Sequence, residues 1–408
     1  MISVAILGHG TVGSGVAELL INHNDRISDK VHSEIEVKYI LELRDFSHMS
    51  YAEKFTKDFE KIVNDEDVKI VAEVMGGINP AYEFVKRCLI AGKSVVTSNK
   101  ELVASKGAEL LEIALNNNVN FLFEASVGGG IPILRPMAQC LAANDINSVT
   151  GILNGTTNYI LNKMIVDGMD FDTALSLAKE KGFAEKDPTA DIEGHDACRK
   201  ICILASLAFG KHVYPNQVKT QGITNVTLND VSYADRFNFA IKLIAHTKKL
   251  PDGHICAEVA PTLVSRNNIL SNVDGVFNAI IVNGDATGDV MFYGKGAGKF
   301  PTASAVVADI IDCAKHLYSR KYFSWQDGYD GYVVDDSGKI GYYVVAQSSD
   351  FESLVESFDK TFEENRCNIK NRTLNEIAFI TDEMSVSSFN EKISNLKCDK
   401  IKIMKTLI

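Results

Sequence analysis

The residues best suited to chemistry lie in one acidic segment near the middle of the chain. A helix is predicted to end at Gly182 and another to begin near Gly194, and glycine and proline crowd several carboxylates into the irregular loop between them. Asp196 and Lys200 follow on the second helix, four residues apart, so both side chains project from one face. By itself this pair could be an exposed ion pair of little value. The carboxylates crowded in front of it instead favour a catalytic segment.

A glycine-rich turn near the N-terminus is the second candidate site. Gly8, Gly10 and Gly13 fit the pattern G-x-G-x-x-G directly after an apolar strand and before a helix. Gly8 allows the tight turn, Gly10 lets the backbone approach a pyrophosphate, and Gly13 lets the helix pack on the strand. The helix start at Thr11 and Val12 offers N–H groups and a positive dipole end to phosphates. The turn therefore predicts dinucleotide binding, the alternative being a glycine-rich connection without a ligand.

The residues after the second predicted strand bear on which dinucleotide binds. An acid at this position holds the ribose hydroxyls of NAD, and Glu42 or Asp45 could fill that role. Arg44, between them, could instead pair with the extra phosphate of NADP, or be an ordinary surface residue. We favour NADP on this basis and keep NAD as the alternative.

The elements that must position these residues follow two patterns. The first part of the chain alternates strands and helices, which predicts a Rossmann-like parallel sheet covered by helices. Strands are expected over residues 3–7, 36–43, 69–74, 94–97 and 120–124, and helices over 12–21, 81–91 and 102–115. Longer helices at 172–181 and 194–209, with strands at 239–245, 255–259 and 276–282, predict an α+β catalytic and dimerisation domain.

A third pattern begins near Gly331. Strands at 342–347, 376–381 and 401–406 alternate with helices at 351–363 and 388–395, which predicts a ferredoxin-like β-α-β-β-α-β module. The chain is therefore expected to hold an α/β nucleotide domain over 1–130, completed by a helix at 296–318, a substrate domain over 131–318 and a C-terminal module over 330–408.

Composition bounds the class of protein. With 408 residues, 46% of them apolar and 23% charged, the chain is long enough for two or three well-buried domains. A formal net charge of -11 argues against nucleic acid or an anionic membrane as the main partner. No run reaches the ~18 apolar residues of a membrane span and no signal-peptide pattern is present, so a cytoplasmic protein is expected. The eight scattered cysteines are expected to be free thiols.

The acidic segment and several others together resemble one enzyme family. Its signature runs Ala, three residues, Gly, then Asp-Pro and Asp-x-x-Gly-x-Asp, and after three more residues Lys. The sequence fits it at Ala178, Gly182, Asp187, Pro188, Asp191, Gly194, Asp196 and Lys200. Further matching segments are 8–15, 98–101, 124–130, 154–158 and 294–298. Over about residues 1–318 the chain is thus similar to the homoserine dehydrogenases, in their monofunctional form.

The resemblance implies the interconversion of L-homoserine and L-aspartate 4-semialdehyde with NAD(P), a step in threonine, methionine and isoleucine biosynthesis. Hydride transfer at the alcohol carbon needs a group that takes or returns the hydroxyl proton. By its position in the motif Lys200 is implied as this general acid/base, and Lys100 as a second lysine near the nicotinamide. Two ammonium groups beside a cationic nicotinamide would favour the neutral amine that this role requires.

The resemblance also implies which residues hold the ligands. Glu185 and Asp196 match residues that bind the substrate's ammonium and hydroxyl groups, while Asp191 is expected to fix the same pocket or to cap the next helix. Thr156 belongs to a strand-to-helix turn that lines the cleft, with helix capping as the alternative. Gly182 is expected close to both ligands. The residues expected at the cofactor are Gly8, Gly10, Thr11, Val12, Gly13, Arg44, Gly76, Lys100, Gly182, Glu185 and Gly298.

The resemblance extends to an ion, the C-terminal module and assembly. Glu124, Val127, Gly129 and Ile131 match a sodium site made mostly of backbone carbonyls. The last ~80 residues are similar to an ACT domain, an amino-acid-sensing module. Its strand-to-helix turn at 347–352 lacks the usual Asp-x-x-Gly, so threonine as an effector and a purely dimerising role both stay open. A homodimer or homotetramer is expected.

Two other classes of protein share some of these features. A semialdehyde dehydrogenase would need a nucleophilic Cys with a His at a catalytic turn, and neither Cys198 nor Cys140 fits that pattern. A non-catalytic NAD(P)-sensing regulator with an ACT module would not need the carboxylate–lysine cluster. Nicotinamide reduction with homoserine as the only alcohol separates the three classes.

Overall fold

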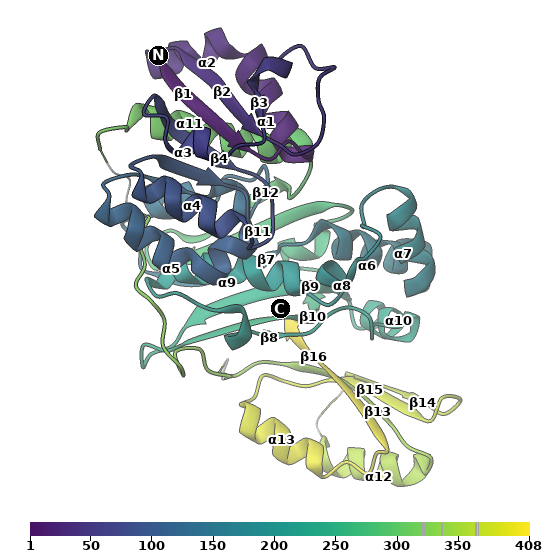
Figure 1. Ribbon diagram of the computed structural model, residues 1–408. Helices are drawn as coiled ribbons and strands as arrows, with labels where there is room; N and C mark the ends of the chain where they lie inside the picture. Colours follow the sequence, from purple (N-terminus) through teal and green to yellow (C-terminus); the bar gives the residue numbers. More distant parts are fainter. Residues whose placement is uncertain (320–322, 336–337, 364, 366) are drawn as a thin grey trace. The chain divides into compact units, whose positions relative to one another are not determined.

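The computed structural model describes residues 1–319, 323–335, 338–363, 365 and 367–408 (Figure 1). These residues divide into two compact units, each assembled from several chain segments. The first unit comprises Met1–Val149, Cys198–Val218 and Phe277–Tyr332, and the second Thr150–Ala197, Lys219–Val276 and Val333–Ile408. The division into three domains stays a prediction, and within the expected 330–408 module residues 336–337, 364 and 366 lie outside the described residues.

The first unit is built on a parallel sheet with the strand order β3-β2-β1-β4-β5-β6. Its strands are β1 (Ile2–Leu7), β2 (Ile35–Leu41), β3 (Phe55–Thr56), β4 (Val68–Glu73), β5 (Ser94–Thr97) and β6 (Phe121–Leu122). This is the order of a doubly wound dinucleotide-binding sheet, which confirms the predicted Rossmann-like fold. Every residue of β1 is buried, which explains why Ser3 is the only polar residue in the strand.

Helices cover this sheet. They are α1 (Thr11–Asn22), α2 (Asn24–Val31), α3 (Glu60–Val63), α4 (Ala81–Ile90), α5 (Lys100–Asn116) and α11 (Lys299–Lys315), with short helical turns η1 (Ala52–Lys54), η2 (Glu124–Ser126) and η3 (Pro136–Cys140). α11 is the helix expected from the sequence to return to this domain, and it packs beside α1 (Figure 1). Gly15 allows this approach, since a Cβ there would lie 2.9 Å from the Cβ of Ala303.

Further elements complete the first unit. β11 (Phe277–Gly284) and β12 (Gly288–Lys295) form an antiparallel hairpin, and η4 (Pro215–Gln217) is a short turn. Two elements, β7 (Ile146–Ile152) and α9 (His195–Phe209), run from one unit into the other. Within the described residues, no helix has both the length and the apolar character to cross a membrane. The eight cysteines all lie in the described part of the chain and are free thiols, as predicted.

The second unit is organised around the antiparallel pair β9 (Phe239–Lys249) and β10 (Ile255–Ser265). Its helices are α6 (Gly155–Asp167), α7 (Phe171–Glu180), α8 (Thr189–Ile192) and α10 (Leu228–Arg236), with the turn η5 (Ile269–Asn272). The strand predicted at 255–259 was too short, because β10 continues through Pro261. On its other edge β10 pairs with β8 (Lys219–Thr220) before this proline and with β16 (Lys400–Leu407) after it. Pro261 falls in the gap between these partners, where the missing N–H costs little.

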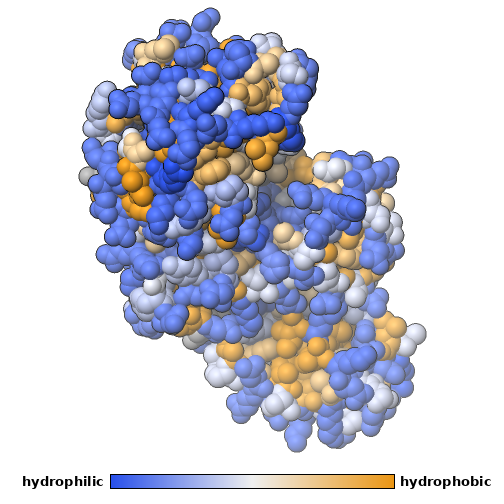
Figure 2. All heavy atoms as spheres, viewed as in Figure 1, coloured by the Kyte–Doolittle hydropathy of each residue, from blue (hydrophilic) through white to orange (hydrophobic). Residues whose placement is uncertain are grey.

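The C-terminal part of the second unit has the predicted β-α-β-β-α-β order. Its elements are β13 (Tyr342–Gln347), α12 (Phe351–Thr361), β14 (Asn368–Asn371), β15 (Glu376–Ile380), α13 (Val386–Ser394) and β16, with the strand order β16-β13-β15-β14. This arrangement confirms the ferredoxin-like prediction, although no residue range was predicted for the strand β14. Aromatic and aliphatic side chains such as Tyr342, Phe358 and Phe379 form its buried core. Figure 2 shows further apolar residues gathered over the strands of this module.

Candidate active site

The turn between β1 and α1 has the geometry that a dinucleotide needs. Gly8 has φ +99°, a left-handed conformation that favours glycine. A Cβ on Gly13 would lie 2.1 Å from the Gly8 carbonyl oxygen, so only glycine lets α1 start this close to the strand. Gly10 is exposed and has open space around it. No described side chain caps α1, so the start of the helix at Thr11 and Val12 keeps N–H groups that phosphate oxygens can use.

Beside this turn, the acid that the sequence offers for binding a ribose is engaged by the protein itself. Glu42 accepts hydrogen bonds from the backbone N–H groups of His9 (3.0 Å), Leu43 (2.9 Å) and Arg44 (3.1 Å), and from Arg44 Nη2 at 2.8 Å. These bonds, the guanidinium's above all, lower the pKa of Glu42 to about 2. Arg44 Nη2 also donates to the carbonyl of His9 at 3.2 Å. Glu42 therefore orients Arg44, and few of its lone pairs remain for a ribose.

A cavity of about 370 Å³ opens against the turn. It is lined by Gly8, His9, Gly10, Leu41, Glu42, Leu43, Arg44, Lys57, Phe59, Val74, Met75, Pro80 and Phe84. Most of these side chains are apolar, as a flat adenine ring requires. Arg44 and Lys57 bring two positive charges to its wall, of which the sequence pattern indicated only the first.

His9 was not anticipated from the sequence, because the pattern G-x-G places no requirement on its middle residue. Its side chain is 4% exposed and is enclosed by aromatic rings of the segment after β2. Its ring centroid lies 4.5 Å from that of Phe46 and 4.9 Å from that of Phe55, and Nε2 is 3.2 Å from the hydroxyl of Tyr51. Burial lowers the pKa of His9, so the neutral ring is favoured. This cage holds the segment that follows Arg44 against the glycine turn.

Lys100 is the first residue of α5, and a network from the sheet fixes its position. Asn99 caps α5 through its side chain. Thr97 Oγ1 accepts from the N–H of Asn99 at 2.9 Å and donates to Glu73 at 2.5 Å. Glu73 also accepts from the N–H of Gly76 at 3.4 Å, and its full burial raises its pKa. The network therefore links the Gly76 turn to the helix start that bears Lys100.

The acidic loop lies between α7 and α9. Gly182, with φ +73°, follows the end of α7, and Gly194, with φ +82°, turns the chain from α8 into α9. Asp191 on α8 and Asp196 on the first turn of α9 both accept hydrogen bonds from Asn154 Nδ2, at 2.7 and 2.9 Å. Two of the predicted carboxylates are thus brought together by Asn154, which belongs to the segment 154–158 that was expected to line the cleft or to cap a helix.

Lys200 follows Asp196 by one turn of α9. Asp196 is 3% exposed and Lys200 is 7% exposed, so the interpretation as an exposed surface pair is wrong. Thr156 Oγ1 donates to the carbonyl of Phe183 at 2.7 Å and so ties α6 to the acidic loop. Gly182 and Glu185 are exposed on this loop. Their contacts with ligands stay predictions.

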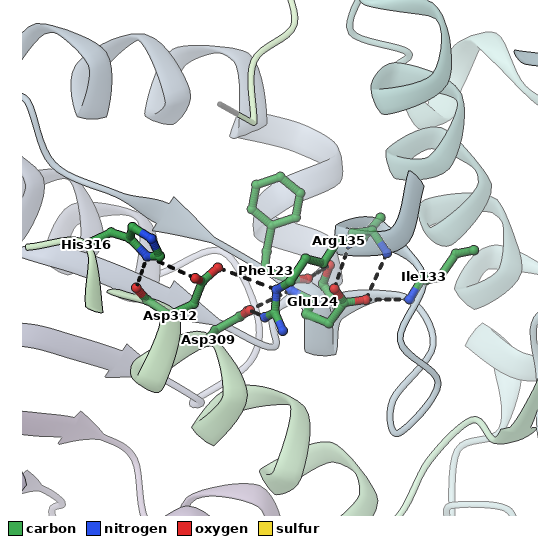
Figure 3. Close-up of polar contacts among 9 residues, drawn as sticks. Phe123, Glu124, Ile133, Arg135, Asp309, Asp312 and His316 are labelled. Carbon is green, nitrogen blue, oxygen red and sulfur yellow. Dashed lines mark hydrogen bonds and ion pairs between the residues drawn. The ribbon is translucent and has the colours of Figure 1, made fainter. Parts of the chain in front are cut away.

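The predicted ion site belongs to a buried polar cluster of the first unit (Figure 3). The Glu124 carboxylate accepts hydrogen bonds from the backbone N–H groups of Ile133 (2.6 Å), Leu134 (2.8 Å) and Arg135 (2.8 Å). The N–H of Glu124 donates to Asp309 at 2.8 Å, and Arg135 forms an ion pair with the same carboxylate. Burial raises the pKa of Asp309 to about 7, against the opposing charge of Arg135. The cluster fixes the loop after β6 on α11.

Glycines let this loop approach the segment that precedes α11. A Cβ on Gly129 would lie 2.3 Å from the carbonyl oxygen of Gly296. Gly298, with φ +123°, is the residue before α11, the helix that packs on α1. In the part of the chain that the structure describes, there is no group of three or more His, Cys, Asp or Glu side chains that could hold a metal ion. Any ion at Glu124 would therefore depend on backbone carbonyls, such as those of Val127, Gly129 and Ile131.

A doubly wound sheet, a glycine turn that leaves helix amides open to phosphates, and a helix with a buried carboxylate and lysine define the chain as an NAD(P)-dependent oxidoreductase. Models of known families agree with this class and make it specific. The model described as "Homoserine dehydrogenase, NAD binding domain" matches residues 8–124, and the model described as "Homoserine dehydrogenase" matches residues 132–311.

Individual proteins extend the likeness. The homoserine dehydrogenase of a Synechocystis species is 44% identical over 319 residues, which are 76% of this chain and 73% of that protein. The crystal structure of a homoserine dehydrogenase from Thiobacillus denitrificans matches with a TM-score of 0.89 and 32% identity, over 100% of this chain and 98% of the other. A hyperthermophilic archaeal homoserine dehydrogenase in complex with NADPH matches with a TM-score of 0.65 and 29% identity, over 76% and 97%. The chain belongs to the homoserine dehydrogenase family.

Proposed function

We propose that this chain catalyses the reversible reduction of L-aspartate 4-semialdehyde to L-homoserine with NAD(P)H, within threonine, methionine and isoleucine biosynthesis. The observation that carries the proposal is the pairing of Asp191 with Asp196 one helical turn before the buried Lys200. An amino-acid alcohol presents an ammonium group that carboxylates bind, and a hydroxyl whose proton must leave as the hydride does. The proposed site offers a group for each task.

Lys200 acts as the general acid/base. In the oxidative direction its neutral amine accepts the hydroxyl proton of homoserine, and in the reductive direction its ammonium returns a proton to the oxygen of the aldehyde. The bound dinucleotide supplies the hydride acceptor or donor at nicotinamide C4. Burial of Lys200 supports this role because a shielded group exchanges its proton with the substrate rather than with bulk water. Lys100, the first residue of α5, would serve as the second lysine near the nicotinamide when the dinucleotide is bound.

The acidic loop holds the substrate. Asp191 and Asp196 bind its ammonium and hydroxyl groups together with Glu185, while Gly182 brings backbone close to both ligands. Thr156 lines the same cleft. Its hydrogen bond to the loop at Phe183 supports this placement, because the bond sets the start of the segment that carries Glu185.

NADP is the preferred dinucleotide. Arg44 and Lys57 line the cavity beside the glycine turn, where the ribose 2′-phosphate of NADP would carry its charge. Glu42, the acid that would favour NAD, is engaged by three backbone amides and by Arg44. The hyperthermophilic archaeal relative is a complex with NADPH, which supports the same preference.

A sodium ion is held by Glu124 with the carbonyls of Val127, Gly129 and Ile131. The residues present fit this role, because no loop N–H in the described residues donates to these three carbonyls. Three neutral oxygens and one carboxylate already shared with amides match a monovalent cation better than a divalent one. The ion would order the loop after β6.

The C-terminal module is an ACT-type domain that pairs two copies of this chain, in a homodimer or homotetramer. Apolar residues gathered over its strands support pairing (Figure 2). In its strand-to-helix turn, Ser349 donates through both N–H (2.7 Å) and Oγ (2.8 Å) to Asp399, and Asp350 caps α12. Because these turn groups already bind the protein, dimerisation is favoured over a threonine site.

The test uses the full chain with L-homoserine as the only alcohol, at alkaline pH, and follows formation of the reduced nicotinamide with NAD⁺ and with NADP⁺. We expect turnover with both and a higher kcat/KM with NADP⁺. Adding threonine up to millimolar concentration is expected to leave the rate unchanged. A protein that binds NADPH but shows no homoserine-dependent reduction with either cofactor would contradict the proposed activity.

A further inference from the structure

Asn154 uses both ends of its side-chain amide. At the start of α6 its Oδ1 accepts a hydrogen bond from the N–H of Thr157 at 2.8 Å, which caps the helix. Its Nδ2 donates to Asp191 Oδ1 and to Asp196 Oδ2. Asn154 is 5% exposed, so neither function can pass to water without moving the helix. The opposite orientation of the amide is excluded, since its NH₂ group would then face the N–H of Thr157.

The two carboxylates come from separate elements, α8 and α9, and share Asn154 Nδ2 as a donor. Each has an oxygen within hydrogen-bond distance of the same nitrogen, so these oxygens lie within about 6 Å of each other. Two negative charges at that distance repel, and such a pair normally resists ionising twice. The N–H groups of Asn154 offset the repulsion, one for each acid.

The position of Asn154 is itself fixed from the far side of α6. Asn158, one helical turn later, donates from Nδ2 to the carbonyls of Val273 (2.9 Å) and Gly275 (3.1 Å). The fully buried Lys242 donates to the same Val273 carbonyl at 2.6 Å and lies 3.4 Å from Asn158 Oδ1. The buried Lys242 therefore helps to hold the first turn of α6 in place, and with it Asn154.

We propose that Asn154 is a positioning residue that holds Asp191 and Asp196 as a doubly ionised pair for the ammonium group of the substrate. The identity of that substrate rests on the proposed function, whereas the pairing rests on the contacts of Asn154. A doubly ionised pair attracts an ammonium group more strongly than a pair in which one carboxylate has taken up a proton. Asn154 thus acts on substrate affinity through the acids and has no part in proton transfer.

Asn154→Asp is the sharpest test because aspartate caps a helix as well as asparagine does. The substitution removes both donors and places a third carboxylate against the pair. We expect KM for L-homoserine to rise about 10- to 100-fold near neutral pH, with a smaller change in kcat and no change in the Kd of the dinucleotide. One of the three acids will hold a proton, so the acidic limb of the pH profile of kcat/KM will move to higher pH. Asn154→Ser, a neutral cap that removes the amide donors without adding a charge, should raise KM and move that limb to higher pH by a smaller amount.

The matched control is Asn268→Asp. Asn268 also caps a helical turn, by accepting from the N–H of Leu270 at 3.0 Å, but its Nδ2 makes an exposed contact with a main-chain oxygen of Ile408, the last residue of the sequence. This variant should keep the KM, the kcat and the pH profile of the unaltered chain. Equal kinetics in Asn154→Asp and Asn268→Asp would overturn the proposal. So would an equal fall of kcat and dinucleotide affinity in both Asn154 variants, which would mark a purely structural role.

A readout without turnover separates this inference from the proposed activity. The added acid of Asn154→Asp should have a raised pKa in the folded state, so its charged form costs stability at high pH and that cost disappears as pH falls. The deficit in Tm relative to the unaltered chain should therefore shrink between pH 8 and pH 5. For Asn268→Asp, where the contact with Ile408 is exposed and screened by water, the difference should change much less. A Tm deficit of Asn154→Asp that does not depend on pH would contradict the proposal that the added acid lies against two ionised carboxylates. This holds whether or not homoserine is the substrate.

Discussion

The glycine turn at 8–13 and the acidic segment at 182–200 both present groups for a ligand, but by opposite physical means. In the turn the groups are backbone amides, and their geometry depends on absent side chains, since a Cβ on Gly13 would meet the Gly8 carbonyl at 2.1 Å. In the acidic segment the groups are charged side chains that repel, and their geometry depends on an added donor, Asn154. The geometry of the backbone amides is determined by residues within the turn itself. The geometry of the charged side chains depends instead on a residue from another part of the fold.

The largest effect is expected at Lys200. Lys200→Ala should lower kcat for homoserine oxidation by about 100- to 10,000-fold, because it removes the group that takes the proton. The Kd for NADPH, measured by its fluorescence, should stay unchanged, since the glycine turn is intact. Lys200→Arg is the matched control: it keeps the charge but cannot give up a proton, so it should be as slow as Lys200→Ala. Near-normal turnover in either variant would contradict proton transfer by this lysine.

The next effect concerns the two ways in which glycine serves the turn. Gly13→Ala should weaken dinucleotide binding about tenfold or more and also lower Tm, because overpacking against Gly8 costs about 1–3 kcal/mol. Gly10→Ala should weaken binding with little change in Tm, since its site is open in the protein. Calorimetric Tm and NADPH titration on both variants check this contrast. If Gly10→Ala destabilised the fold as much as Gly13→Ala, the account of the turn would be wrong.

The smallest effect is expected at the cavity wall. Arg44→Ala and Lys57→Ala should each raise KM for NADP⁺ about tenfold by removing a charge-assisted contact with the 2′-phosphate, and leave KM for NAD⁺ nearly unchanged. Arg44→Ala also removes the guanidinium from Glu42, which leaves this carboxylate able to bind the ribose hydroxyls of NAD⁺. The preference for NAD⁺ relative to NADP⁺ should therefore increase more in Arg44→Ala than in Lys57→Ala. Steady-state kinetics with both cofactors measure the ratio. Parallel losses for NAD⁺ and NADP⁺ would mean that neither residue discriminates between them.

The same contrast explains what could be predicted from the sequence. The parallel sheet, the glycine turn and the ferredoxin-like order of the C-terminal module depend on local patterns, and the structure confirms them. The two-residue β3 and the continuation of β10 past Pro261 were missed, because the partners of these strands decide where they end. Burial of Asp196 and Lys200 could not be predicted from their spacing either, since spacing alone does not distinguish an exposed helix face from a buried one.

Side-chain partners distant in the sequence account for the rest. Asn154 lies 37 residues before Asp191 and 42 before Asp196, and no spacing rule connects them. The sequence made Glu42 a candidate for binding the ribose. Its hydrogen bond with the N–H of His9, 33 residues away in the sequence, is visible only in the folded chain. The one signal available at position 154 was an asparagine at a helix start. It indicates a helix cap but not the hydrogen bonds with the two carboxylates.

Chemical rescue of Lys200→Ala tests the central claim most directly. If Lys200 is the general acid/base, small primary amines added to this variant should restore part of the homoserine-dependent reduction of NADP⁺. The restored rate should rise with the concentration of the unprotonated amine, and its pH dependence should follow the pKa of the amine added. Amines of several sizes that leave the rate unchanged, in a protein that still binds NADPH and homoserine, would contradict the account.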